Sequence, residues 1–362
     1  MKIVIDGRLW SETGPGRYIR NLVNGLEKID RENEYYVFLL EKDFKTVSLE
    51  KNFTKILTPF RWYSFGEQIN LPKIINHIKP DLVHFPMFNV PIFYRGKFIV
   101  TIHDLIHHHF QMKKATTHNA LFYQVKTLGY NTAFSSAVKK SLKVVVPSRF
   151  VKAQLVDEYK IPESKVVVTY EAAEEKIVNL AQKNIPSPVS KPYLFYVGNT
   201  HPHKNIPFLI QGWKILRGKY PDLKLVLAGP ETIFYQQLKK EYSVEGIDFL
   251  GQVSEEELVA LYKNAEAYIF PSLEEGFGIP VLEAMACGCP VVSSNAASLP
   301  EVGGDAALYF NPKDEDDMVK TVEKVLRDKG LRQELIKKGE RRYKEFSWKK
   351  MAEETLKIYR EV

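Results

Sequence analysis

The sequence contains few cysteines and no long apolar segment. Only Cys287 and Cys289 occur among its 362 residues, and their spacing beside Gly288 fits neither a disulfide framework nor a zinc ribbon. No run of about 18 apolar residues is present, and acidic Asp6 stands where a signal peptide would still be apolar. These absences exclude a disulfide-stapled fold, predict no membrane-spanning helix and favour a reducing, cytoplasmic location.

The net charge of +7 is small, but it is concentrated in the first half of the chain. Residues 51–150 hold 14 lysines and arginines against three acidic residues. Such a segment favours an anionic partner, whether a phospholipid surface, a diphosphate or a nucleic acid. Trp62 and Phe65 lie close to Arg61, a mixture that suits a membrane surface, although an aromatic stripe that faces a protein core is at least as common.

Short β-branched runs alternate with longer helical patterns along the chain, which is typical of parallel βαβ units. We therefore expect an α/β fold, and a length of 362 residues suits about two doubly wound, Rossmann-like domains. Strands are expected at residues 2–6, 35–40, 82–85, 98–103 and 144–147, and then at 193–198, 224–229, 248–250, 267–270 and 290–293.

Residues 171–191 separate the two sets of strands. They are rich in charged and small residues and include Pro186 and Pro188, so we interpret them as a linker. The first domain is accordingly expected at residues 1–180 and the second at 191–345. Ligands bind doubly wound sheets at the carboxyl ends of the strands, so the site is expected in a cleft where the two domains face each other.

The stretch from Phe270 to Gly288 carries the clearest motif. A strand ends at Phe270, a loop with glycines follows, and Pro280 opens a helix that Gly288 closes. The free N–H groups of residues 276–282, together with the helix dipole, favour an anion such as a diphosphate. Glu275 and Glu283 bracket this anion site, so that one carboxylate could bind sugar hydroxyls and the other ribose hydroxyls.

Residues 270–290 resemble the glutamate, seven residues, glutamate signature of the retaining GT-B glycosyltransferases of family four, also called glycosyl transferases group 1, and of its mannosyltransferases in particular. The resemblance covers nearly the whole chain, because further motifs follow in the family's order: Gly14–Tyr18, Thr101–Leu105, Tyr196–Asn205 and Ser347–Trp348. It implies the GT-B fold, in which two Rossmann-like domains face each other across a cleft and a C-terminal helix, here residues 346–362, returns to the first domain.

In this family the first glutamate holds the donor sugar and the second holds the ribose of a nucleotide diphosphate sugar, roles that fall by position on Glu275 and Glu283. The resemblance assigns His103 to the sugar beside the reacting carbon. It assigns Lys204 to the diphosphate, whose departing negative charge an ammonium group can neutralise in place of a metal. The family often has an arginine just after the glycine or just before the lysine of this motif, where this sequence has Asn199 and His203.

Two further motifs have both a structural and a functional interpretation. Gly14 and Gly16 can let a backbone approach a phosphate, but a lone Gly-x-Gly is also an ordinary turn. His107, His108 and His109 are adjacent, so they cannot all face one metal ion from a regular element, and no metal site is expected. The expected catalytic residues are His103, Lys204 and Glu275. The expected donor-binding residues are Gly14, Gly16, Arg17, Asn199, His203, Lys204, Gln252, Val253, Glu275, Gly276, Phe277, Gly278, Ile279, Leu282 and Glu283.

The function that the resemblance implies is retaining hexosyl transfer in polysaccharide biosynthesis, with no metal and no other cofactor. The donor would be a GDP- or UDP-linked sugar, GDP-mannose first among them, and the acceptor a glycan or a lipid-linked molecule. Peripheral contact with an anionic membrane at its cytoplasmic face is expected to accompany this activity.

Three alternatives remain open. One is a nucleotide-sugar epimerase or phosphorylase of the same fold. Another is a dehydrogenase, which is disfavoured because Ile19 occupies the third small position of a dinucleotide fingerprint. The third is a basic nucleic-acid or membrane-binding protein without catalysis, in which Glu275 and Glu283 would have no role; no nucleic-acid partner is expected, because the basic residues match no known reading motif.

Overall fold

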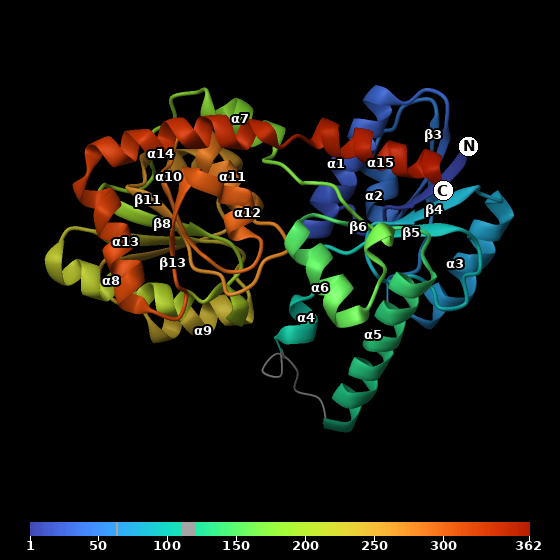
Figure 1. The fold of residues 1–362 in the computed structure, drawn as a ribbon, viewed down its shortest axis with the longest axis horizontal. Helices are drawn as coiled ribbons and strands as arrows, with labels where there is room; N and C mark the ends of the chain where they lie inside the picture. The colour runs from blue at the N-terminus through green and yellow to red at the C-terminus, as the bar shows by residue number, and fades with distance from the viewer. Residues whose placement is uncertain (63, 111–119) are drawn as a thin grey trace. The chain divides into compact units, whose positions relative to one another are not determined.

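The computed structural model of the chain describes residues 1–62, 64–110 and 120–362, apart from the side chains of residues 120–128 (Figure 1). The described residues divide into two compact units. Unit 1 takes its residues from Met1–Leu105, Thr116–Glu171 and Trp348–Val362, and unit 2 takes them from Ile106–Ala115 and Ala172–Ser347. Each unit contains one parallel sheet flanked by helices, so the predicted α/β architecture with two doubly wound sheets is confirmed.

Unit 1 is built on seven parallel strands in the order β3-β2-β1-β4-β5-β6-β7. The strands are β1 (Lys2–Asp6), β2 (Glu34–Leu39), β3 (Phe53–Leu57), β4 (Leu82–Phe85), β5 (Phe98–Thr101), β6 (Val144–Val146) and β7 (Val166–Val168). The helices are α1 (Gly14–Ile29), α2 (Glu41–Thr46), α3 (Phe65–Ile78), α5 (Ala120–Lys140), α6 (Arg149–Tyr159) and α15 (Trp348–Glu361). The strand order reverses between β1 and β4, which is where a doubly wound sheet opens a crevice at its carboxyl edge.

Unit 2 is built on six parallel strands in the order β10-β9-β8-β11-β12-β13. The strands are β8 (Tyr193–Val197), β9 (Lys224–Ala228), β10 (Ile247–Gly251), β11 (Ala267–Phe270), β12 (Val291–Ser294) and β13 (Ala307–Phe310). The helices are α4 (Ile106–His109), α7 (Glu175–Ala181), α8 (Ile206–Lys219), α9 (Ile233–Glu241), α10 (Glu255–Asn264), α11 (Ile279–Ala286), α12 (Leu299–Gly303), α13 (Glu315–Arg327) and α14 (Lys329–Arg342). Its strand order reverses between β8 and β11.

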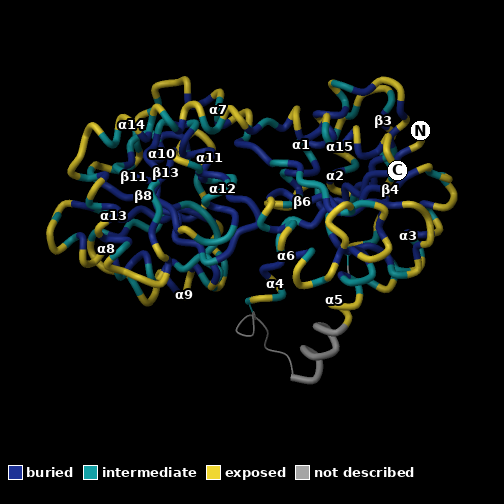
Figure 2. Tube along the Cα trace, in the orientation of Figure 1, coloured by how far each residue is buried: buried dark blue, intermediate teal, exposed yellow. Residues whose placement is uncertain are grey.

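The central strands are continuous apolar runs because helices cover both faces of each sheet. Every residue of β4, β5, β6 and β11 is buried, as the dark blue core of each unit in Figure 2 shows. Three strands were absent from the prediction, namely β3, β7 and β13, and each of them lies at an edge of its sheet. Partial exposure weakens the apolar pattern of β3, as at Lys55, but not that of β7, which consists of three valines.

The interpretation of residues 171–191 as a linker was wrong over part of its length. Helix α7 lies there and packs on α10 and α11, burying Ile177, Leu180 and Ala181. Residues 172–180, placed in the first domain by the predicted boundary, therefore belong to unit 2, as do residues 106–110. The charged positions of this helix face solvent, which is why its composition resembled that of a loop.

The C-terminal helix α15 belongs to unit 1, as predicted, although it follows the last helix of unit 2 in the chain. It packs along α1 at very short distance: a Cβ atom on Gly25 would lie 2.5 Å from the Cβ of Ala352. Its buried Tyr359 hydroxyl lies 2.6 Å from Nδ1 of His84 in β4, whose Nε2 lies 2.8 Å from Thr101 Oγ1 in β5. The helix is thus joined to the centre of the sheet by buried hydrogen bonds.

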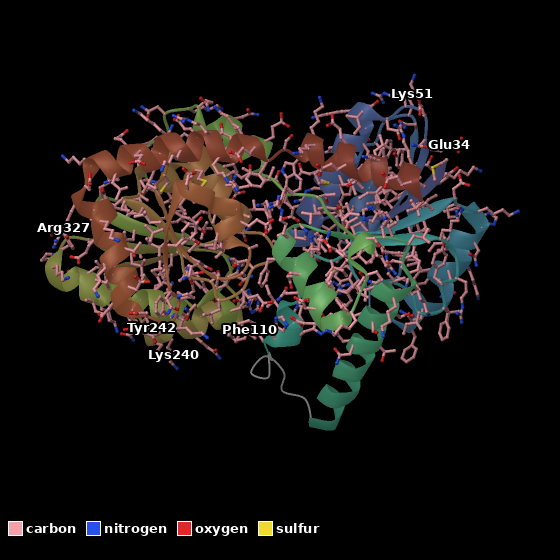
Figure 3. All side chains as sticks on the ribbon, viewed as in Figure 1. Glu34, Lys51, Phe110, Lys240, Tyr242 and Arg327 are labelled. Carbon is pink, nitrogen blue, oxygen red and sulfur yellow. The ribbon has the colours of Figure 1, made fainter. Side chains whose placement is uncertain are left out.

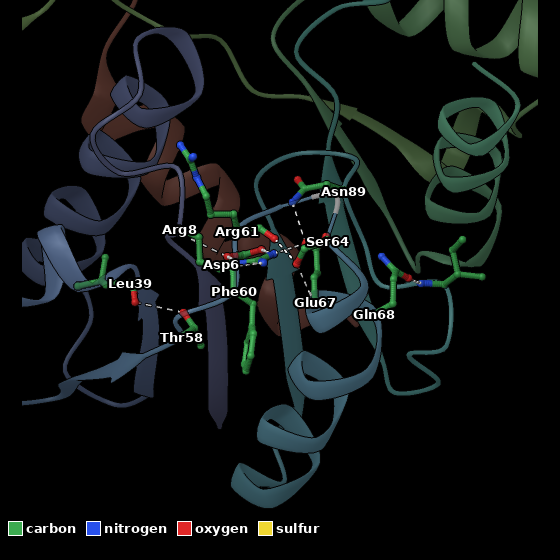
Figure 4. Close-up of polar contacts among 11 residues, drawn as sticks. Asp6, Arg8, Leu39, Thr58, Phe60, Arg61, Ser64, Glu67, Gln68 and Asn89 are labelled. Carbon is green, nitrogen blue, oxygen red and sulfur yellow. Dashed lines mark hydrogen bonds and ion pairs between the residues drawn. The ribbon is translucent and has the colours of Figure 1, made fainter. Parts of the chain in front are cut away.

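A buried ionic network holds the carboxyl edge of the unit 1 sheet (Figure 4). Arg8, just after β1, donates from Nε to Asp6 Oδ1 at 2.8 Å and from Nη2 to Glu67 Oε1 at 2.6 Å. Asn89, in the loop after β4, donates to the same Glu67 oxygen at 3.3 Å. The two carboxylates raise the pKa of the buried Arg8 guanidinium although desolvation alone would lower it. The network ties α3 to the loops that follow β1 and β4.

Among the described helices, none is long and apolar enough to cross a membrane.

We predict that His84→Asn lowers the free energy of unfolding by about 1–3 kcal/mol, because the buried Tyr359 and Thr101 hydroxyls lose a partner. Burial, and to a smaller extent the positive charge of His103, lowers the pKa of His84 to about 3. The unfolded chain, with a histidine pKa of about 6.5, therefore takes up a proton that the folded chain refuses, and wild-type stability falls as the pH drops from about 6.5 toward 3. Urea unfolding at several pH values measures both effects. An equally steep acid loss in the variant would contradict the assignment.

Candidate functional site

The candidate site of unit 2 lies where the strand order of its sheet reverses. The loop after β8 and the loop after β11 leave neighbouring strands at their carboxyl ends and turn to opposite faces of the sheet. A backbone hydrogen bond of 2.7 Å from Leu273 N to His203 O joins the two loops. The topology therefore brings together two motifs that lie about 70 residues apart in the sequence.

The loop after β11 has the strand, loop and helix arrangement that its sequence predicts. Gly278 has φ = 113°, and a Cβ atom there would lie 2.8 Å from a methyl group of Leu299, so this position requires glycine. Ser298 Oγ lies 2.9 and 2.7 Å from the carbonyl oxygens of Glu275 and Phe277. These contacts fix the loop so that α11 begins at Ile279 with its free N–H groups next to it.

Lys204 and Glu275 form a close ion pair at the centre of this site. Lys204 Nζ lies 2.6 Å from Glu275 Oε1, and the two side chains are only 12% and 10% exposed. The ammonium also lies 5.3 Å from the centroid of the Phe270 ring. Glu283, on the first turns of α11, is 2% exposed. A lysine and two glutamates of the predicted motifs are thus buried in one unit, the lysine and the first glutamate in direct contact.

Four buried polar atoms near this pair have no hydrogen-bond partner among the residues that the structure describes. They are Thr200 Oγ1, His201 Nδ1, His203 Nδ1 and Ser272 Oγ. Burial lowers the pKa of His203 to about 3, and the positive charge of Lys204 and the neighbouring His201 contribute. A neutral imidazole still offers one N–H donor. Since unpaired buried polar groups are costly, such a group of potential donors beside an ammonium is suited to an anion with several oxygens.

Helix α4 adds side chains to unit 2 that the sequence did not connect with this site. His109 Nδ1 lies 2.7 and 2.8 Å from the two carboxylate oxygens of Glu274, the residue before Glu275. Phe110, labelled in Figure 3, follows α4, and its ring centroid lies 5.9 Å from that of His203. No group of three histidine, cysteine or acidic side chains suited to a metal ion occurs within residues 1–62, 64–110 and 129–362.

Two other predicted positions of unit 2 have local structural partners. Asn199 caps its own loop, since its Oδ1 accepts a hydrogen bond of 3.2 Å from His201 N and its carbonyl accepts one of 2.7 Å from Tyr196. Gln252 and Val253 directly follow β10, whose last residue Gly251 has φ = 68°. They are at least partly accessible, so their backbone can meet a ligand.

The remaining predicted residues, Gly14, Gly16, Arg17 and His103, belong to unit 1. A Cβ atom on Gly16 would lie 2.5 and 2.6 Å from the carbonyl oxygens of Leu9 and Trp10, so packing alone requires this glycine. Nothing lies within 4 Å of such an atom on Gly14. That these residues face a donor bound in unit 2 remains a prediction.

His103 follows β5 and is held by protein atoms on both ring nitrogens. Nδ1 lies 3.2 Å from Glu171 Oε1, and Nε2 lies 3.0 Å from the carbonyl oxygen of Pro86. The Tyr18 ring meets it edge-on at a centroid distance of 5.0 Å. Desolvation lowers the pKa of His103, but the hydrogen bond and charge of Glu171 raise it more, so the net shift is upward.

Comparisons with known proteins agree with this geometry. Residues 13–177 match the family described as Glycosyltransferase Family 4, and residues 179–342 match the family described as Glycosyl transferases group 1. The matched ranges include every motif discussed above except the C-terminal helix.

The chain belongs to the glycosyltransferases that combine the Family 4 and the group 1 regions.

Two curated relatives of this glycosyl transferase family member come from bacterial O-antigen synthesis. The O-antigen chain mannosyltransferase B of Escherichia coli is 33% identical over 60% of this chain and 60% of its own length. The O-antigen chain mannosyltransferase RfbU of Salmonella typhimurium is 26% identical over 75% of this chain and 72% of its own length. For another, the serotype-specific mannosyltransferase WbdA of Escherichia coli, the match spans only 23% of that protein.

Solved structures confirm the GT-B fold of this family member. Sucrose-phosphate synthase of Thermosynechococcus elongatus superimposes with a TM-score of 0.76 over 100% of this chain and 98% of its own, at 20% identity. The Anabaena HepE structure with UDP and glucose gives a TM-score of 0.74 over the whole of both chains, at 15% identity.

The structure brings some of the predicted residues together and adds others. Lys204, Glu275, His203 and the loop to Leu282 lie in one unit, as their motifs imply. Sequence reasoning missed Glu171 and Glu274 as partners of His103 and His109, because 68 and 165 residues separate the members of these pairs. The only sequence signal for Glu274 was its position next to Glu275. The sequence held no comparable signal for Glu171.

Proposed function

We propose that this family member is a retaining, metal-independent hexosyltransferase that acts in polysaccharide biosynthesis. It takes a hexose, with mannose from GDP-mannose as the first choice, from a nucleotide diphosphate sugar and passes it to a glycan or lipid-linked acceptor. It needs no cofactor besides this donor. The names of its relatives support the sugar, since several are mannosyltransferases.

One observation supports this proposal above all others. The buried pair of Lys204 and Glu275 lies at the switch point of the unit 2 sheet, next to the N-terminus of α11 and to four buried polar atoms without described partners. A diphosphate would provide the acceptors for these donors, and its negative charge would suit both the ammonium and the helix dipole. The hydroxyls of a sugar would in turn suit the carboxylate of Glu275.

The chain's own residues would then divide the work as follows. Lys204, with imidazole N–H groups of His203 and His201 in place of a second cation, stabilises the charge that develops on the departing diphosphate. Glu275 holds the sugar hydroxyls and Glu283 the ribose. The acceptor hydroxyl forms its bond to the anomeric carbon on the face from which the phosphate oxygen departs, and its proton passes to that oxygen. The transferred sugar therefore has the same anomeric configuration in the product as in the donor.

The nucleotide base would be selected by backbone groups near Gln252 and Val253 and by the shape of the pocket. GDP is proposed because of the mannosyltransferase relatives, and UDP is the competing choice because HepE was solved with UDP.

Two alternative enzymes of the same fold can be distinguished by their substrate requirements: an epimerase acts on the donor without an acceptor, and a phosphorylase requires free phosphate. A nucleic-acid binder would leave the buried pair of Lys204 and Glu275 without a role.

We predict that Glu275→Gln reduces transfer roughly 100-fold or more, the usual cost of losing a group that acts on the transition state. The amide keeps an oxygen that can accept a hydrogen bond from Lys204, so the variant should remain folded by circular dichroism. Glu256→Gln, an exposed acid on α10, is the matched control and should transfer normally. Thermal-shift measurements with GDP, UDP, ADP and their sugars identify the donor, because a ligand of the folded state raises the melting temperature.

Near-native transfer by Glu275→Gln would contradict the site. The proposed function would be contradicted if none of GDP, UDP, ADP and their sugars bound, while NAD bound or RNA bound with a steep salt dependence.

We also propose that unit 1 docks on the cytoplasmic face of an anionic membrane through α3. Phe65, Ile69 and Lys73 stand four residues apart on this helix and are exposed, Phe65 by 90% and Ile69 by 54%. Gln68 Oε1 accepts a hydrogen bond of 2.8 Å from Ile92 N, which holds the loop of the 65% exposed Phe93 against the helix. Exposed basic residues accompany this apolar surface: Arg61, Lys73, Arg95 and Lys97. Aromatic and basic groups together suit the lipid interface.

We predict that the chain sediments with vesicles that contain anionic lipid and much less with neutral ones, and that Phe65→Ser with Ile69→Ser abolishes this binding. Ile233→Ser is the matched control, because Ile233 is 65% exposed but lies on unit 2. Binding that ignores the anionic lipid, or that survives the double substitution, would sink this proposal.

A further inference from the structure

His103 has an unusual hydrogen-bond environment for a residue expected to serve a substrate. Both ring nitrogens contact protein acceptors, at 3.2 Å to Glu171 Oε1 and at 3.0 Å to the Pro86 carbonyl oxygen. The side chains of His103 and Glu171 are 17% and 10% exposed, so water competes little for these bonds. The ring orientation is therefore fixed by unit 1 itself.

The identity of the two acceptors determines the charge of the ring. A backbone carbonyl can only accept, so Nε2 must carry a proton to bond with Pro86. An ionised carboxylate can also only accept, so Nδ1 must carry a proton to bond with Glu171. A ring with both protons is an imidazolium.

The surrounding groups leave this charge on His103. Tyr18, on α1, is buried, and desolvation raises its pKa to about 12, so it is neutral. His84, on β4, is neutral because burial and the charge of His103 lower its pKa to about 3. Asp104, the next residue, adds a second negative charge that favours the imidazolium. Among the residues that the structure describes, the charged groups that act on His103 are Glu171 and Asp104, and both stabilise its protonated form.

We propose that Glu171 is a positioning residue that keeps His103 as an imidazolium and fixes its ring, so that His103 serves the transfer as a fixed positive charge and not as a base. This inference rests on the proposed function for its catalytic consequence. With both N–H bonds committed to Glu171 and Pro86, the ring has no lone pair with which to take a proton from an acceptor hydroxyl. A fixed cation instead acts on the transfer through its charge alone, because both of its N–H groups are already used.

The charge assignment can be tested without any substrate. In the full chain with ¹⁵N-labelled histidine, the ring nitrogens of His103, assigned with the His103→Asn variant, should show the imidazolium signature to a pH above the ordinary histidine value of about 6.5. In Glu171→Gln the loss of this signature should occur at lower pH. A wild-type ring that is neutral below pH 6.5, or a midpoint unmoved by Glu171→Gln, would overturn the proposal.

The catalytic consequence has its own measurement. The active form is lost as the pH rises through the pKa of His103, so the descending limb of the kcat profile should move to lower pH in Glu171→Gln. Glu171→Asp retains the carboxylate and should restore part of the shift. Glu163→Gln, an exposed acid of unit 1 that pairs with Lys152, should leave the profile unchanged. A structural role alone would lower kcat equally at all pH values, and that result would overturn the proposal.

These outcomes separate the inference from the proposed function. If no nucleotide sugar supports transfer while the titrations of His103 behave as expected, the proposed function is contradicted and the charge assignment is supported. If transfer occurs but His103 is neutral, the proposed function is supported and the charge assignment is contradicted.

Discussion

The buried ion pair of Lys204 and Glu275 is the interaction around which unit 2 is organised. A buried pair gains little net stability, because desolvation of both charges offsets much of their attraction, yet removing one partner leaves the other charge buried and unpaired. Three features hold the backbone around the pair: a glycine with positive φ at 278, a buried serine at 298 that donates to two carbonyl groups, and a backbone bond between the loops after β8 and β11. This arrangement makes sense as preparation for a ligand that separates the two charges, with its phosphates on the ammonium and its hydroxyls on the carboxylate.

Unit 1 contains a second pair of the same kind, in which a carboxylate fixes a cation. Glu171 holds His103, and the same region of the sheet connects through Thr101, His84 and Tyr359 to the C-terminal helix. The return of that helix is therefore more than a packing feature, because it contributes a buried hydrogen bond on β4, the strand next to the one that His103 follows. Part of the basic charge of the first half of the sequence is exposed, at Arg61, Lys73, Arg95 and Lys97.

The sequence alone predicted the features that depend on neighbouring residues. Continuous apolar runs located the central strands, and the string from Phe270 to Gly288 located the loop and helix of the site. The edge strands β3 and β13 escaped because partial exposure weakens their pattern, and α7 escaped because its charged face resembles a linker. The partners of His103 and His109 could not be predicted, since only the folded chain brings Glu171 and Glu274 to them. Where the family often has an arginine, the sequence indicated only a substitution, and in the structure the buried Nδ1 of His203 has no hydrogen-bond partner among the described residues.

On donor binding, we expect Lys204 to release Glu275 for the diphosphate and Glu275 to release Lys204 for the sugar. A crystal structure of the chain with a bound nucleotide diphosphate sugar tests it most directly. We expect Lys204 Nζ to lie within about 3 Å of a phosphate oxygen and the Glu275 carboxylate to lie within the same distance of a sugar hydroxyl. A donor bound elsewhere, with the ion pair still intact at 2.6 Å, would contradict it.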